Sequence, residues 1–264
     1  MRTSTRMVVL GKIFDTDAQT YITAVEAADG IALEKPVKTA INNFVVGCKA
    51  DGIWSAIKAS CILAGARTLA GALVPLAGTA PTNFNFVSGD YNRKTGLVGN
   101  GSTKYLNSNA QVNTTCPFNN AHLSVYVTDA ATAGIGYIGE DSGPVLNTGE
   151  VALYRQATTL AARFQNTTPA LSSHSPTSTG FIGVARANSS SVTIRANATT
   201  DTITNGSIGT SSITKKIAVH ARDEGGGGAT NGRLAFYSIG ESLDLALLDT
   251  RITTLIDTYN TAIV

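Results

Sequence analysis

The sequence predicts a mainly β protein, a β-sandwich preceded by a mostly helical segment and closed by a C-terminal helix. From Pro81 onward the chain consists of short runs rich in β-branched and aromatic residues, separated by Gly, Asn, Asp and Ser. Short strands with frequent turns favour a sandwich over a parallel sheet with helices. Apolar residues at helical spacing flank this region on both sides. We therefore expect a helical docking segment over residues 1–79 and a sandwich domain over residues 80–264.

Three helices are expected in the leading segment. Asp15 can cap the first helix and Gly30 can end it. Pro36 suits the first turn of the second helix, because proline lacks the N–H that this turn leaves unpaired. The third helix is expected from about Gly52. Isolated helices shorter than about 12–15 residues are marginal in water, so these helices need a packing partner.

Two aromatic side chains in this segment, Phe44 and Trp54, are candidate anchors on a neighbouring molecule. The alternative is that both residues lie in the segment's own core. The sequence does not decide between these two interpretations.

The final helix is expected to begin after Ser242, whose side chain can cap it. Its leucine, isoleucine and tyrosine residues form a narrow apolar stripe along one side. This stripe predicts either a helix that closes the sandwich or a seam between copies of the chain.

The four-glycine run Gly225–Gly228 lacks the Gly-Lys-Ser/Thr ending of a phosphate-binding loop. It instead predicts a mobile hairpin tip.

Composition argues against several partners. The formal net charge is only +2, and the basic residues are scattered, so no nucleic-acid partner is expected. The most apolar stretch, residues 61–78, contains Arg67 and Pro75 and is shorter than the roughly 20 apolar residues of a membrane span, so no membrane insertion is expected. Charged residues make up 14% of the chain, against about 25% in ordinary soluble domains. Much of the surface must therefore be neutral and polar, as in virion proteins or subunits buried against neighbours.

No catalytic, metal-binding or cofactor-binding set is found, so the chain is not expected to be an enzyme. Glycan hydrolysis needs two carboxylates on either side of one sugar bond. The close acidic pairs, Glu140-Asp141 and Asp223-Glu224, are sequence neighbours, which point to opposite faces of a strand. The three cysteines have no metal-ligand spacing and predict free thiols.

Three stretches, residues 84–109, 179–207 and 232–256, resemble a module of phage structural and tail-associated proteins. That module belongs to the concanavalin A-like (laminin G-like) sandwich class. The phrase GLVGNGSTKYL at Gly96–Leu106 matches an early strand pair of the module, and FYSIG at Phe236–Gly240 matches a late strand followed by a helix. The resemblance covers roughly residues 80–260. It implies a jelly-roll fold and a place in the virion, on capsid, tail or fibre.

The resulting expectation is a structural protein of a virus particle, which the resemblance implies to be a bacteriophage, and its expected partners are other virion proteins and copies of itself. The alternative is a host-glycan-binding fibre or tail module, and the third option is a glycan hydrolase. Sugar sites combine aromatic surfaces with polar groups. Four tyrosines beside turns are the candidate glycan contacts: Tyr91, Tyr105, Tyr137 and Tyr154.

Overall fold

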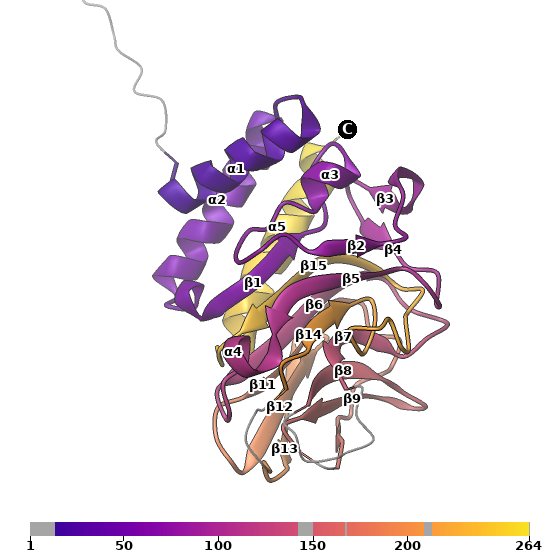
Figure 1. Ribbon diagram of the computed structural model, residues 1–264. Helices are drawn as coiled ribbons and strands as arrows, with labels where there is room; N and C mark the ends of the chain where they lie inside the picture. Colours follow the sequence, from indigo (N-terminus) through magenta and orange to yellow (C-terminus); the bar gives the residue numbers. More distant parts are fainter. Residues whose placement is uncertain (1–13, 142–149, 167, 209–212, 264) are drawn as a thin grey trace, which may run out of the picture.

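The computed structural model describes residues 14–141, 150–166, 168–208 and 213–263. These residues form two antiparallel sheets packed face to face, with helices on the outside of one of them (Figure 1). In sheet A the strands follow the order β13 (Thr199–Thr204), β12 (Ser191–Ala196), β11 (Gly180–Arg186), β6 (Ala121–Asp129), β15 (Arg233–Gly240), β4 (Gly96–Val98) and β3 (Tyr91–Asn92), and β1 (Ile57–Ile62) also pairs with β15. In sheet B the order is β10 (Ala170–Leu171), β9 (Thr159–Phe164), β8 (Val151–Gln156), β7 (Gly136–Glu140), β14 (Lys216–Val219), β5 (Tyr105–Gln111) and β2 (Thr82–Phe84).

The helices are short except for three. They are α1 (Thr16–Asp29), α2 (Lys35–Ala50), α3 (Leu69–Ala72), α4 (Val112–Thr115) and α5 (Leu245–Ala262), with 3-10 turns η1 (Trp54–Ala56) and η2 (Ser88–Asp90). The side chain of Asp15 caps α1 by accepting the N–H of Asp17, and Gly30 ends it with φ of 69°. No helix within the described ranges is long and apolar enough to cross a bilayer.

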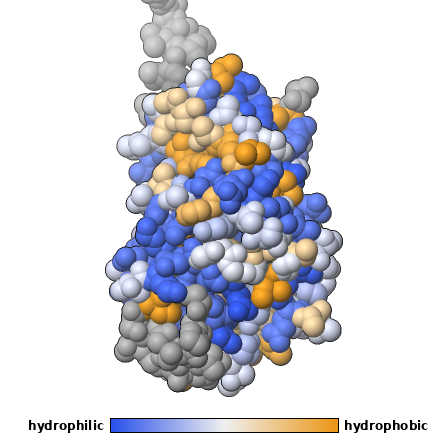
Figure 2. All heavy atoms as spheres, turned by 45° about the vertical axis from the view of Figure 1, so that its right-hand side comes forward, coloured by the Kyte–Doolittle hydropathy of each residue, from blue (hydrophilic) through white to orange (hydrophobic). Residues whose placement is uncertain are grey.

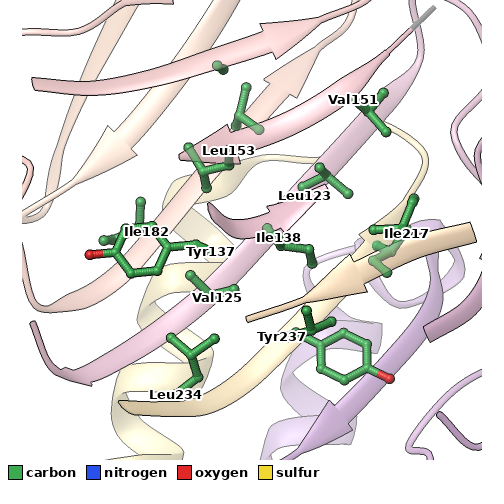
Figure 3. Close-up of a cluster of buried hydrophobic side chains, with 14 of the residues drawn as sticks. Leu123, Val125, Tyr137, Ile138, Val151, Leu153, Ile182, Ile217, Leu234 and Tyr237 are labelled. Carbon is green, nitrogen blue, oxygen red and sulfur yellow. The ribbon is translucent and has the colours of Figure 1, made fainter. Parts of the chain in front are cut away.

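Two hydrophobic clusters lie on opposite faces of sheet A. The first fills the space between the sheets, where Leu123, Val125 and Ile182 of sheet A meet Ile138 and Leu153 of sheet B (Figure 3). The second lies between sheet A and the helices α1, α2 and α5, which gather on one side of the molecule (Figure 1). Sheet A is therefore covered on both faces over β1, β11 and β15, whereas no helix of the described residues contributes to the small clusters on the outer face of sheet B.

The expected third helix is a strand instead. Residues 57–62 form β1, which pairs antiparallel with β15 from Ile57 opposite Gly240 to Ile62 opposite Phe236. Ala59 and Cys61 belong to the core between the sheets, while Ile57 and Ile62 belong to the core under the helices. The sequence is apolar on both sides because the strand is buried on both sides, and this pattern resembles that of a buried helix.

The leading helices pack against the sandwich within the same chain. The Phe44 ring is 2% exposed and meets the Phe236 ring of β15 edge-on, with centroids 5.9 Å apart. Residues 14–79 thus supply a strand and part of a core to the sandwich. Because its ring has almost no free surface, Phe44 does not serve as an anchor on another molecule in this fold. Whether other parts of the segment dock on a neighbour stays a prediction.

The C-terminal helix closes the sandwich. Asp244, rather than Ser242, caps α5 by accepting the N–H groups of Ala246 and Leu247. The apolar stripe of α5 is buried against α2 and sheet A within the chain, so it is not available as a seam between copies. Arg251 holds α5 to the end of α2 through a two-pronged ion pair with Asp51, at 2.6 and 2.7 Å.

Candidate functional site

Three of the four candidate tyrosines are buried or half-buried and contact other residues of the same chain. Tyr137 is fully buried between the sheets, and its ring lies beside Ile182 and Val125 (Figure 3). The hydroxyl of Tyr91 donates to the carbonyl of Ala66 at 2.7 Å. The ring of Tyr154 is 5% exposed, and the Arg222 guanidinium lies 5.2 Å from its centroid.

Burial raises the pKa of Tyr137 and of Tyr154, as expected for phenols removed from water. The prediction of a glycan contact is wrong for Tyr137, because its side chain has no surface. Tyr154 has almost none, and Tyr91 is half-buried against both hydrophobic clusters.

Tyr105 lies on the outer face of sheet B, next to an aromatic residue that the sequence analysis did not select. Phe84 of β2 is directly opposite Tyr105 of β5 in the ladder. Their rings stack in parallel, with centroids 4.4 Å apart and an interplanar angle of 4°. Both rings point outward because the intervening Leu106 turns into the core between the sheets. Phe84 is 36% exposed and Tyr105 is half-buried, so both rings contribute to the accessible aromatic surface.

Amide groups continue this surface along β5. Asn107 and Asn109 follow Tyr105 at every second position, and residues on one face of a strand are about 6.6–6.8 Å apart. The Asn109 carbonyl accepts from the Lys216 ammonium at 2.9 Å, and its amide group donates to the Thr82 hydroxyl at 3.1 Å. The surface therefore combines an aromatic platform with oriented amide, hydroxyl and ammonium groups. We call this set, Phe84, Tyr105, Asn107, Asn109, Thr82 and Lys216, the sheet B surface.

The four-glycine run packs beside this surface. Asp223 accepts the N–H groups of Gly225 and Gly227, both at 2.9 Å, and so fixes the loop. Gly226 has φ of 82°, and a Cβ atom there would lie 2.6 Å from the Tyr105 ring, so only glycine fits this contact. The run is not a hairpin tip, because it joins β14 of sheet B to β15 of sheet A. The carboxylate of Asp223 and the ring of Tyr105 contact the loop, and its mobility stays a prediction. Burial, with the nearby charges of Asp223 and Glu224, raises the pKa of Tyr105.

The acidic residues considered for hydrolysis are held inside the fold. The carboxylate of Glu140 is 2% exposed and accepts the backbone N–H of Glu224 at 2.7 Å. Asp141 is ion-paired with Arg163 at 2.9 Å and Arg222 at 3.3 Å. Burial raises the pKa of Asp141, and the two arginines oppose that shift. Within the described ranges no group of three or more His, Cys, Asp or Glu residues is placed to hold a metal ion.

Trp54, unlike the buried Phe44, is half-buried, and it lines a surface pocket. The three cysteines are free and buried, as the sequence predicted. On the face shown in Figure 2, apolar side chains gather in the upper half, whereas those below are mainly polar with scattered apolar residues.

Comparison with known proteins confirms the fold class. No protein-family model matches the chain, and no curated protein matches it. Among solved structures, the botulinum neurotoxin serotype D binding domain is similar with a TM-score of 0.51 and 11% identity, over 75% of this chain and 51% of that chain. The CBM40 domain of Ruminococcus gnavus IT-sialidase, bound to α2,3-sialyllactose, gives a TM-score of 0.41 and 10% identity, over 59% of this chain and 95% of that chain.

The chain thus spans about half the length of the neurotoxin structure that it matches. At these identities the similarity shows the fold alone. The protein is a jelly-roll β-sandwich with a helical layer on one face and a C-terminal helix, as its sequence predicted.

Proposed function

We propose that this chain is a glycan-binding module and that the sheet B surface is its binding site. The observation that carries this proposal is the Phe84–Tyr105 stack, an aromatic platform exposed on the outer face of sheet B beside Asn107 and Asn109. The neurotoxin structure of similar fold is named as a binding domain, and this supports a binding role for the present chain.

The chemistry of this surface suits a sugar. The apolar C–H face of a pyranose can pack on the Phe84 ring, while hydroxyl groups around its edge need both donors and acceptors. Asn107 offers both, and Lys216 adds donors, whereas Asn109 has only acceptor capacity left because its amide group donates to the Ala80 carbonyl and the Thr82 hydroxyl. Because Asn109 already binds Lys216 and Thr82, its orientation is fixed before a ligand arrives, which lowers the entropy cost of binding.

The test is a glycan array with the full chain and three variants. Phe84→Ala and Tyr105→Ala are expected to reduce binding at least tenfold, because each removes half of the platform. Val87→Ala is the matched control, since Val87 is 59% exposed, three residues from Phe84, and not aromatic. The proposal fails if the wild-type chain retains no glycan, or if Phe84→Ala binds as well as Val87→Ala does.

A second proposal follows from the sequence resemblance of residues 84–109, 179–207 and 232–256 to phage structural proteins. We propose that the module is carried on a virus particle, where it contacts other virion proteins or copies of itself. Mass spectrometry of purified particles tests this location. The proposal fails if the chain is made during infection but is absent from particles.

A further inference from the structure

A second pocket lies on the helical side of the molecule, around the only tryptophan of the sequence. It has a volume of about 220 Å³. Helix α1 forms one wall, and the segment after β1 forms another. Its lining includes Asp17, Thr20, Ala24, Trp54, Pro75 and Leu76.

The Trp54 ring is held in a fixed orientation. Its indole N–H donates to the Asp17 carboxylate at 3.1 Å. The Lys49 ammonium lies 2.7 Å from both Asp17 and Asp15, and 5.8 Å from the centroid of the Trp54 ring. The hydrogen bond from Lys49 lowers the pKa of Asp15, so this carboxylate is ionised at neutral pH. The pocket therefore presents a preoriented aromatic ring with a carboxylate at its edge.

These groups select a class of ligand. The single Lys49 ammonium neutralises only one of the two carboxylates, but it contacts both and lies near the Trp54 ring, so a cationic ligand at Asp17 would meet its positive charge. An anionic ligand would approach the Asp17 carboxylate, which is half exposed. A neutral ligand with a flat apolar face and hydroxyl donors fits both the indole and the acceptor oxygens. The volume is below the roughly 300–1,000 Å³ of pockets for drug-sized ligands, so it suits one ring.

We infer that the Trp54 pocket binds a single neutral pyranose ring, independently of the sheet B surface. Aromatic–proline packing could also occupy such a pocket, but a proline ring has no donor for Asp17. If both sites bind sugar, the chain is bivalent for glycans long enough to reach both. Binding at the Trp54 pocket does not depend on binding at the sheet B surface.

Tryptophan fluorescence tests this inference directly, because Trp54 is the only tryptophan and reports on this pocket alone. The full chain is titrated with glucose, galactose and N-acetylglucosamine. We expect a saturable change in emission for at least one sugar. Asp17→Asn should weaken binding by about tenfold or more, because it removes a charged acceptor.

A pair of variants on α1 gives the matched control. Ala24→Phe places a ring in the pocket from an exposed position and should abolish the change, whereas Ala27→Phe, also exposed but outside the pocket lining, should keep it. Phe84→Ala should also keep it, which separates this inference from the sheet B proposal. The inference fails if no sugar gives a saturable change up to about 100 mM. It also fails if Ala24→Phe binds like Ala27→Phe, or if only a proline-rich peptide changes the emission.

Discussion

Replacing Phe44 by alanine is expected to destabilise the whole sandwich and not only the helices. The ring is 2% exposed and packs edge-on against Phe236 of β15. Truncation of a buried phenylalanine removes about 3–5 kcal/mol of folding free energy. Since whole domains are stable by about 5–15 kcal/mol, the urea midpoint should fall by a large fraction of its wild-type value. A helical segment that is only docked on the sandwich would not produce this effect.

The assay is equilibrium unfolding in urea, followed by far-ultraviolet circular dichroism and by Trp54 fluorescence. Both signals should move together in one transition, because Trp54 and the strands belong to elements that share a core. Val46→Ala is the control on the same helix, since Val46 is 45% exposed and should change stability by less than about 0.5 kcal/mol. The shared core would be refuted if the β signal of Phe44→Ala kept the wild-type urea midpoint while its helical signal was lost at a lower urea concentration.

Three further outcomes are expected. Burial lowers the pKa of His220 to about 3, whereas in the unfolded chain a histidine takes up its proton near pH 6.5. The unfolded state therefore binds more protons below pH 6.5, and His220 should contribute a loss of about 2 kcal/mol of unfolding free energy between pH 7 and 5 that disappears in His220→Asn. His122, whose pKa burial lowers to about 4, should contribute a similar loss that remains in this variant. Burial raises the pKa of all three thiols to about 12, so alkylation followed by mass spectrometry should label them only after denaturation. A polysaccharide panel should show no hydrolysis; turnover that disappears in Glu140→Gln would contradict the non-enzymatic prediction.

Local signals in the sequence predicted most of the fold. The cap at Asp15, the stop at Gly30 and the proline near the start of α2 fix the first two helices, and all three are found where expected. The alternating and β-branched runs after residue 81 form the strands of the sandwich. These features depend on neighbouring residues along the chain, which a sequence displays directly.

The error at strand β1 shows what local sequence patterns cannot distinguish. The run from Ile57 to Ile62 is buried on both faces, because helices cover one side and sheet B the other. Only the tertiary arrangement tells such a run from a buried helix. The predicted cap of α5, Ser242, is wrong by two residues, because Asp244 caps this helix. Serine and aspartate are both good capping residues, so the sequence alone does not favour one of them.

The candidate site depended even more on tertiary structure. Tyr105 and Tyr137 both lie in strands beside turns, yet one faces outward and the other fills the core. The sequence does not single out Phe84, because its ladder partner Tyr105 cannot be read from the sequence and because Phe86, two residues later, is buried in the core. The pocket at Trp54 combines α1 with residues more than 50 positions later, so no sequence motif marks it.

The pairing of β1 with β15 has a consequence for how the protein is made. The hydroxyl of Ser60 donates to the carbonyl of Tyr237, a residue 177 positions later. During synthesis the apolar strand β1 emerges from the ribosome long before its partner exists. The second core cannot close until β15 and α5 have left the ribosome, because both contribute to it. Pairings this distant in sequence form slowly, and exposed apolar strands aggregate while they wait. Yields should therefore depend strongly on the temperature and rate of expression, even for a chain whose finished fold is stable.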